Sequence, residues 1–149
     1  MAQTYIGSTL RTGSGTLTDD TDGGYVVVSQ TTTVTTASAG TATSSYVNLP
    51  ASSQIIDIFV DGTVAASAGA GTATAIATTV GSAAAGTQYM SSTDGIAGGR
   101  LTFAPTAAQT AAMANISTNQ KVYITVDPNG TILTTQGVFR LTVVYAQKV

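Results

Sequence analysis

The sequence contains no histidine, cysteine, tryptophan or glutamate, and charged residues make up only 8% of its 149 residues. Ordinary soluble domains are about 25% charged. The absence of cysteine excludes a disulfide framework and thiolate metal sites. The absence of histidine removes the commonest base for activating a serine or threonine hydroxyl. We therefore expect a protein that is not an enzyme and needs no cofactor.

Positive charge is also sparse. The formal net charge is -2, and the basic residues are scattered along the chain at Arg11, Arg100, Lys121, Arg140 and Lys148. Binding to nucleic acid needs clustered Lys and Arg, so no nucleic-acid partner is expected. No run approaches the roughly 20 apolar residues of a membrane span. The N-terminus lacks the basic and apolar regions of a secretory signal, which indicates synthesis in the cytoplasm.

What the sequence does have is Thr, Ala, Gly and Ser, arranged in two regions. Residues 1–24 are polar and glycine-rich, and we interpret them as an N-terminal arm or extended segment. From Tyr25 onward, runs of Val, Ile and Thr alternate with turn residues at intervals of roughly 8–12 residues. Residues 25–149 are therefore expected to form one all-β domain, an antiparallel β-sandwich resembling a jelly roll.

The individual elements are predicted from local pattern. Strands are expected at 25–36, 43–49, 54–62, 72–80, 86–90, 100–103, 121–126 and 138–145, with a loop at 91–99. Asp61-Gly62 reads as a turn, and 121–133 as a hairpin turning at 127–130. Within 54–62, alternation places Ile56, Ile58 and Val60 on one face. One short helix is expected near 106–115, because Thr106 and Gln109 have capping-box spacing.

The acidic cluster Asp19, Asp20 and Asp22 is the candidate metal site, because hard cations take carboxylate oxygens from glycine-bearing loops. A complete EF-hand loop would also need a glutamate at its end, and the chain has none. A solvated turn is the favoured interpretation.

Asp57 is unusual among the aspartates because it is flanked by Ile56 and Ile58 on a strand expected to be buried. A buried carboxylate needs a partner, so we expect it to pair with Arg100, Arg140 or backbone amides. The alternative is a carboxylate pair for glycoside hydrolysis. That alternative is disfavoured, because the other candidates, Asp61, Asp94 and Asp127, lie beside Gly or Pro in expected turns.

Tyrosine side chains are the candidate interface residues, since their rings give contact area at low entropic cost. Tyr5, Tyr46 and Tyr89 are the interface candidates. Tyr123 and Tyr145 fall in the predicted C-terminal sheet, and we expect them at the edge of the core.

The order of elements from Tyr46 to Tyr145 resembles small virion proteins of tailed bacteriophages and phage-like particles. The resemblance is carried by an aliphatic strand at 55–61, a small-residue stretch with Val80-Gly81, a short strand at 100–103 and a terminal strand at 137–145. It implies a capsid decoration or cement protein, a homotrimer or other closed oligomer, that binds the major capsid protein on the outside of a virion. A head-fibre base, tail or receptor-binding module that recognises host glycans is the alternative.

Overall fold

The computed structural model describes residues 11–12, 15–16 and 25–148. Arg11–Thr12 (β1) pairs with Gly15–Thr16 (β2) in a separate two-stranded sheet. The other elements are β3 (Tyr25–Thr35), β4 (Thr43–Leu49), β5 (Ser53–Val64), β6 (Ile76–Gly81), β7 (Met90–Asp94), β8 (Gly99–Leu101), α1 (Ala107–Ala114), β9 (Gln120–Pro128) and β10 (Val138–Lys148). The start of β3 at Tyr25 coincides with the change in composition.

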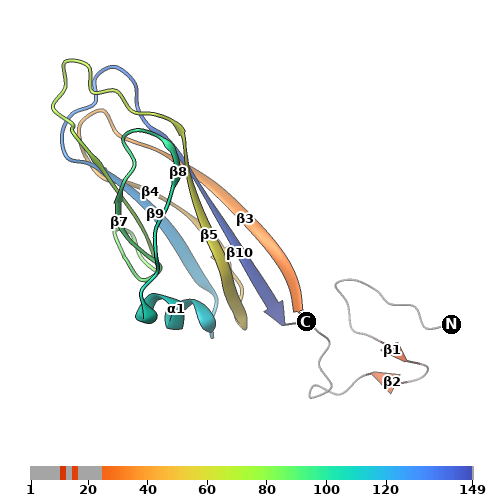
Figure 1. The fold of residues 1–149 in the computed structure, drawn as a ribbon. Coiled ribbons are helices and arrows are strands. Elements are labelled where there is room, and N and C mark those ends of the chain that lie inside the picture. Colours follow the sequence, from red (N-terminus) through yellow and green to blue (C-terminus); the bar gives the residue numbers. More distant parts are fainter. Residues whose placement is uncertain (1–10, 13–14, 17–24, 149) are drawn as a thin grey trace.

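A nested set of antiparallel pairs organises the strands. β3 pairs with β10, β4 with β9, β5 with β8 and β6 with β7, as in one long hairpin. Two further pairings, β10 with β5 and β9 with β6, roll that hairpin into four-stranded sheets of order β3-β10-β5-β8 and β4-β9-β6-β7. This is the strand order of an eight-stranded jelly roll. The expected antiparallel, jelly-roll-like β-sandwich is confirmed, as Figure 1 shows.

The core lies between the inner faces of the two sheets. On β10, Phe139, Leu141, Val143 and Tyr145 are all buried, whereas Arg140 is exposed, as alternation predicted. Facing them, β9 contributes Val122, Ile124 and Val126, each of which is fully buried. Tight interdigitation of such β-branched and aromatic side chains is the main source of stability in a sandwich.

The predicted pattern of β5 is wrong in two respects. Asp61 and Gly62 do not form a turn; they lie within the strand, opposite Arg140 and Phe139 of β10. A β-bulge shifts the register near Ile56, because Ile55 pairs with Tyr145 whereas Asp57 pairs with Val144. The extra residue breaks the alternation, so Ile55 is buried and Ile56 is 53% exposed.

The predicted hairpin at 121–133 is also wrong. β9 continues to Pro128, its neighbours are β4 and β6, and the chain then crosses to the other sheet. Residues 131–133 form a loop instead, in which the Ile132 N–H donates to the Ser38 carbonyl at 3.1 Å and Leu133 N–H to Ala68 at 3.2 Å. The loop at 131–133 and the loops that contain Ser38 and Ala68 lie at the end of the sandwich opposite α1 (Figure 1).

Two other strands differ substantially from the sequence prediction, and the strand expected at 100–103 ends at Leu101. The strand expected at 86–90 begins only at Met90 and runs through much of the expected loop, to Asp94. The first part of the strand expected at 72–80 is a loop, in which the Asn129 side-chain carbonyl accepts the N–H groups of Thr74 and Ala75 at 2.8 and 2.9 Å. In both places a side chain distant in sequence supplies the backbone's hydrogen-bond partner.

The helix is confirmed together with its cap. The Thr106 hydroxyl accepts the Gln109 N–H at 3.3 Å, and the Gln109 side chain accepts the Thr106 N–H at 2.9 Å. Gln109 also donates to the Thr87 carbonyl at 2.9 Å, which ties α1 to the loop before β7. No helix in the described part of the chain is long and apolar enough to cross a membrane.

Leu141→Ala tests the importance of the β10 alternation. Leu141 is fully buried, so we expect this variant to lower the free energy of unfolding by about 2–5 kcal/mol, measured by urea denaturation. The matched control is Leu133→Ala, because Leu133 is 61% exposed and its truncation leaves no cavity. Equal losses in both variants would contradict the assignment of the core.

Candidate interaction surfaces

Tyr46 lies on the outer face of the sheet β4-β9-β6-β7. The alternation of β4 buries Val47 and Leu49 and leaves Tyr46 42% exposed. Tyr46 is directly opposite Tyr123 of β9, with ring centroids 5.2 Å apart and ring planes tilted by 50°. Such cross-strand aromatic pairs stabilise a sheet and leave part of each ring for a partner.

Lys121 completes this surface. Its Nζ atom lies 4.1 Å from the centroid of the Tyr46 ring, the geometry of a cation–π contact. Next to Tyr123 on the other side is Gly81 of β6, whose lack of a side chain makes room for the Gly86 backbone and the Gln88 side chain. We call Tyr46, Tyr123 and Lys121 the tyrosine platform. It offers two tilted rings and one cation, a combination suited to a flat apolar surface that also carries acceptors.

The loop between β6 and β7 borders the tyrosine platform. The Ala85 N–H donates to the Thr125 hydroxyl at 2.8 Å, and the Ser44 hydroxyl lies 2.8 Å from the same Thr125 oxygen. Thr125 is consequently buried although it points to the outer side of the sheet. These bonds fix the loop beside the rings, so the platform has a preformed rim.

The opposite sheet carries a charge cluster on its outer face. Asp61 of β5 lies between Arg140 of β10 and Arg100 of β8 in the strand register. Arg100 donates from Nε and Nη2 to the two carboxylate oxygens at 2.7 and 3.2 Å, and Arg140 donates from Nη2 at 3.1 Å. The Arg100 guanidinium also lies 4.5 Å from the centroid of the Phe59 ring.

The charges in this cluster stabilise one another. The Arg100 hydrogen bonds, with a smaller contribution from Arg140, lower the pKa of the Asp61 carboxyl despite the opposing effect of burial. Asp61 in turn raises the pKa of the Arg100 guanidinium. The cluster thus keeps three charged side chains engaged with one another on the same sheet face.

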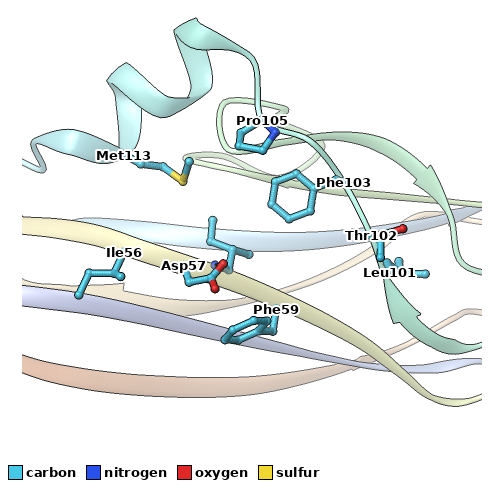
Figure 2. Close-up of a pocket in the computed structure, with 9 residues that line it drawn as sticks. Ile56, Asp57, Phe59, Leu101, Thr102, Phe103, Pro105 and Met113 are labelled. Atoms are coloured by element: carbon cyan, nitrogen blue, oxygen red, sulfur yellow. Dashed lines mark hydrogen bonds between the residues drawn. The ribbon is translucent and has the colours of Figure 1, made fainter.

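A groove of about 260 Å³ lies beside β5, between that strand, the chain after β8 and α1. Figure 2 shows Met113 of α1 and Phe103 on one side, with Ile56, Asp57 and Phe59 on β5. Its lining is mostly apolar and contains one carboxylate, that of Asp57. Glycoside hydrolysis requires two positioned carboxyl groups, and the nearby Asp61 carboxylate is held by two arginines.

Asp57 does not pair with Arg100 or Arg140, contrary to part of the expectation. Its side chain is exposed, and Oδ1 accepts the backbone N–H of Ile58 at 2.8 Å, so the backbone-amide alternative is the one observed. Asp61, which was expected only as a turn residue, forms ion pairs with both arginines. The strand register explains the exchange, because Asp61 lies directly opposite both Arg140 and Arg100, whereas Asp57 lies opposite Val144.

The structure separates the interface candidates. Tyr46 is on the surface, but Tyr89 is only 2% exposed and packs in the core, where burial raises the pKa of its phenol. Tyr145 is also buried, and Tyr123 is half-buried on the tyrosine platform. Tyr5 and the metal candidates Asp19, Asp20 and Asp22 lie outside the described residues. Within the described ranges, no group of three or more acidic, histidine or cysteine residues is placed to hold a metal.

Sequence reasoning missed the pairing that makes the tyrosine platform and the charge cluster. Alternation along β9 does place Lys121 and Tyr123 on one face, and this signal was present in the sequence. The register that brings Tyr46 opposite Tyr123 could not be read from the sequence, because it depends on strands far apart in the chain.

Comparison with protein-family models, curated proteins and solved structures finds no match for the chain.

Asp61→Asn tests the charge cluster through its pH dependence. Because the pKa of folded Asp61 is lowered, the ion pairs contribute fully above the ordinary carboxyl pKa of about 4 and are lost as the pH falls through the lowered value. We expect the variant to melt a few degrees below the unmodified protein at pH 7, and the difference to shrink below about pH 4. A difference that persists unchanged at acid pH would contradict this role.

Proposed function

We propose that this chain is a non-enzymatic structural protein of a virus particle, a decoration or cement protein that binds the outer surface of a capsid and stabilises it. Its partners are the major capsid protein and further copies of itself, as the expected homotrimer. It would be made in the host cytoplasm and act on the capsid surface. The assignment to a virus particle rests on the resemblance of the order of elements to small virion proteins.

The observation that carries the proposal is the chemistry of the outer sheet faces. On β3 and β10 the outward side chains include Ser29, Thr31, Thr33 and Thr142, and the charge cluster neutralises much of its own charge. A surface of small hydroxyl groups lets copies and neighbours approach closely without like-charge repulsion. Repetition on a lattice then multiplies weak contacts through valency.

The architecture supports the proposal without deciding it. Jelly rolls form viral capsid domains, but they also form lectins and cupins. Function on such a fold has to be argued from its surfaces. The tyrosine platform supplies a contact site of the kind that dominates protein interfaces, where tyrosine is enriched at the energetic centre.

Capsid binding tests the proposal directly. The purified chain is mixed with capsids assembled from the major capsid protein of the same genome, and bound protein is measured by co-sedimentation. We expect saturable, stoichiometric binding that Tyr46→Ala weakens roughly thirtyfold, as for loss of an interface hot spot. Tyr46→Phe is the matched control, because it keeps the ring against Tyr123 and Lys121. Capsids that fail to bind the unmodified protein would refute the proposal.

The second candidate function is recognition of host-surface glycans by a head-fibre base, tail or receptor-binding module. The tyrosine platform favours it, because exposed rings stack on the apolar faces of sugars and Lys121 can donate to their oxygens. Glycan-array binding that is lost in Tyr46→Ala, without any affinity for capsids, would support this function over the first.

A further inference from the structure

β3 is an edge strand whose unpaired side lacks the features that usually block pairing with another chain. It is 11 residues long, lies at the end of the sheet order β3-β10-β5-β8, and contains no charged residue, proline or glycine. An edge strand presents unpaired N–H and C=O groups that can pair with another chain. Natural proteins usually block such edges with lysine, proline, a bulge or a covering segment.

The hydrogen bonds near the end of β3 show which backbone groups face the free side. The Thr35 carbonyl accepts from the Thr43 hydroxyl at 2.7 Å, away from β10, whereas the Thr36 N–H donates to the carbonyl of Gly137, next to β10, at 3.0 Å. Backbone groups alternate in direction along a strand. The N–H and C=O groups of Val27, Ser29 and Thr31 therefore point away from β10, and no partner for them lies among the described residues.

Part of this edge is already covered. The Thr32 hydroxyl lies 2.6 Å from the Ser45 hydroxyl of β4, and Thr43 occupies the edge at Thr35. No other described residue covers Val27–Thr31, which we call the open edge. Val27 is 62% exposed, the most exposed large hydrophobic side chain in the described part of the chain.

Of the other strand edges of the same sandwich, that of β4 lies against β3 where Ser45 meets Thr32, and the rest are short or guarded. β8 has only three residues, one of them Arg100. β7 has five and ends in Asp94. On the part of β5 that β8 does not reach, the Asp57 carboxylate accepts the outward N–H of Ile58. The open edge has no such protection.

We propose that the open edge is a site of self-association, at which β3 pairs with β3 of a second copy in antiparallel orientation around a two-fold axis at Ser29. This axis places Ser29 opposite its own copy and Val27 opposite Thr31 of the second copy. No charges meet, and hydroxyl groups face one another as Thr31 and Thr142 already do at 3.3 Å across β3 and β10. Each exposed Val27 is then covered by a cross-strand neighbour.

Such a contact is isologous, so it closes at two copies and continues the sheet through both of them. The family resemblance implies a trimer or other closed oligomer without naming the surface that joins the copies, and the contact proposed here does not depend on capsid binding. An edge contact alone is smaller than a standard interface of about 800 Å² per partner. The dimer is therefore expected to be weak in dilute solution and reinforced wherever copies are held at high local density.

Ser29→Pro in the full chain is the decisive variant. It removes the central edge N–H from both copies, and proline is tolerated at an edge position whose N–H faces solvent. Analytical ultracentrifugation at high protein concentration should show a monomer–dimer equilibrium whose dissociation constant rises roughly thirtyfold in this variant, for the loss of two hydrogen bonds. Ser29→Lys, which keeps the N–H but adds an edge charge, should also favour the monomer. Thermal melting confirms that each variant is folded.

Thr142→Lys is the matched control, because Thr142 lies opposite Thr31 on the same outer face but on the central strand β10. It should leave the dimer intact. A dimer lost in Thr142→Lys but kept in Ser29→Pro would mean association through the sheet face and would overturn the proposal. A protein that stays monomeric at every concentration, or a trimer unaffected by Ser29→Pro, would overturn it too, whatever the capsid experiment finds.

The absence of cysteine allows the register to be measured as well. Directly opposed residues in an antiparallel pair have Cα atoms about 4.5–5.5 Å apart, within the range that a disulfide can join. Ser29→Cys should form a covalent dimer under mild oxidation faster than Thr142→Cys. Equal rates for the two variants would contradict an axis at Ser29.

Discussion

The sandwich depends on the insertion of β10 between β3 and β5, and of β9 between β4 and β6. Each of these two strands forms a hydrogen-bonded ladder on both sides and contributes a row of buried side chains on its inner face. Their registers determine what else comes together. β10 places Arg140 beside Asp61, and β9 places Tyr123 beside Tyr46. Both candidate surfaces are therefore consequences of strand pairing in the interior.

A chain with so few charges uses several of them to control its own strands. Asp61 holds β5, β8 and β10 together on their outer side through two arginines. Asp57 satisfies an outward N–H of β5, and the Asp94 carboxylate accepts the N–H groups of Ile76 and Ile96 at 2.9 and 3.0 Å. In the proposed assembly, contacts with neighbours would be made by the exposed hydroxyl groups. The low charge and the hydroxyl-rich surface are therefore related, because several of the few charged side chains bind the protein's own strands.

Features encoded locally could be predicted from the sequence. β4 has the expected boundaries, α1 has its capping box, and alternation along β10 identified its buried residues correctly. The errors arose where a segment distant in sequence determines the local conformation. The bulge at Ile56 is defined only against β10, and the turn residues at 127–130 lead to the other sheet because β9 is already paired on both sides. Tyr46 was predicted as an interface residue and lies on the surface, but its pairing with Tyr123 could not be predicted without the strand register.

The nested pairing also has a consequence for the order of folding. β10 is the last strand of the sandwich to be synthesised, yet β3 and β5 are joined within their sheet only through it. Until β10 is synthesised, β3 lacks its partner in the sheet and β5 has only the three residues of β8 to pair with. Closing contacts over so long a separation is slow. Waiting strands of this kind are prone to aggregate during synthesis. Hydroxyl side chains on β3 make the unpaired strand less apolar than one built of Val and Ile, but no charge or proline blocks its edge at this stage.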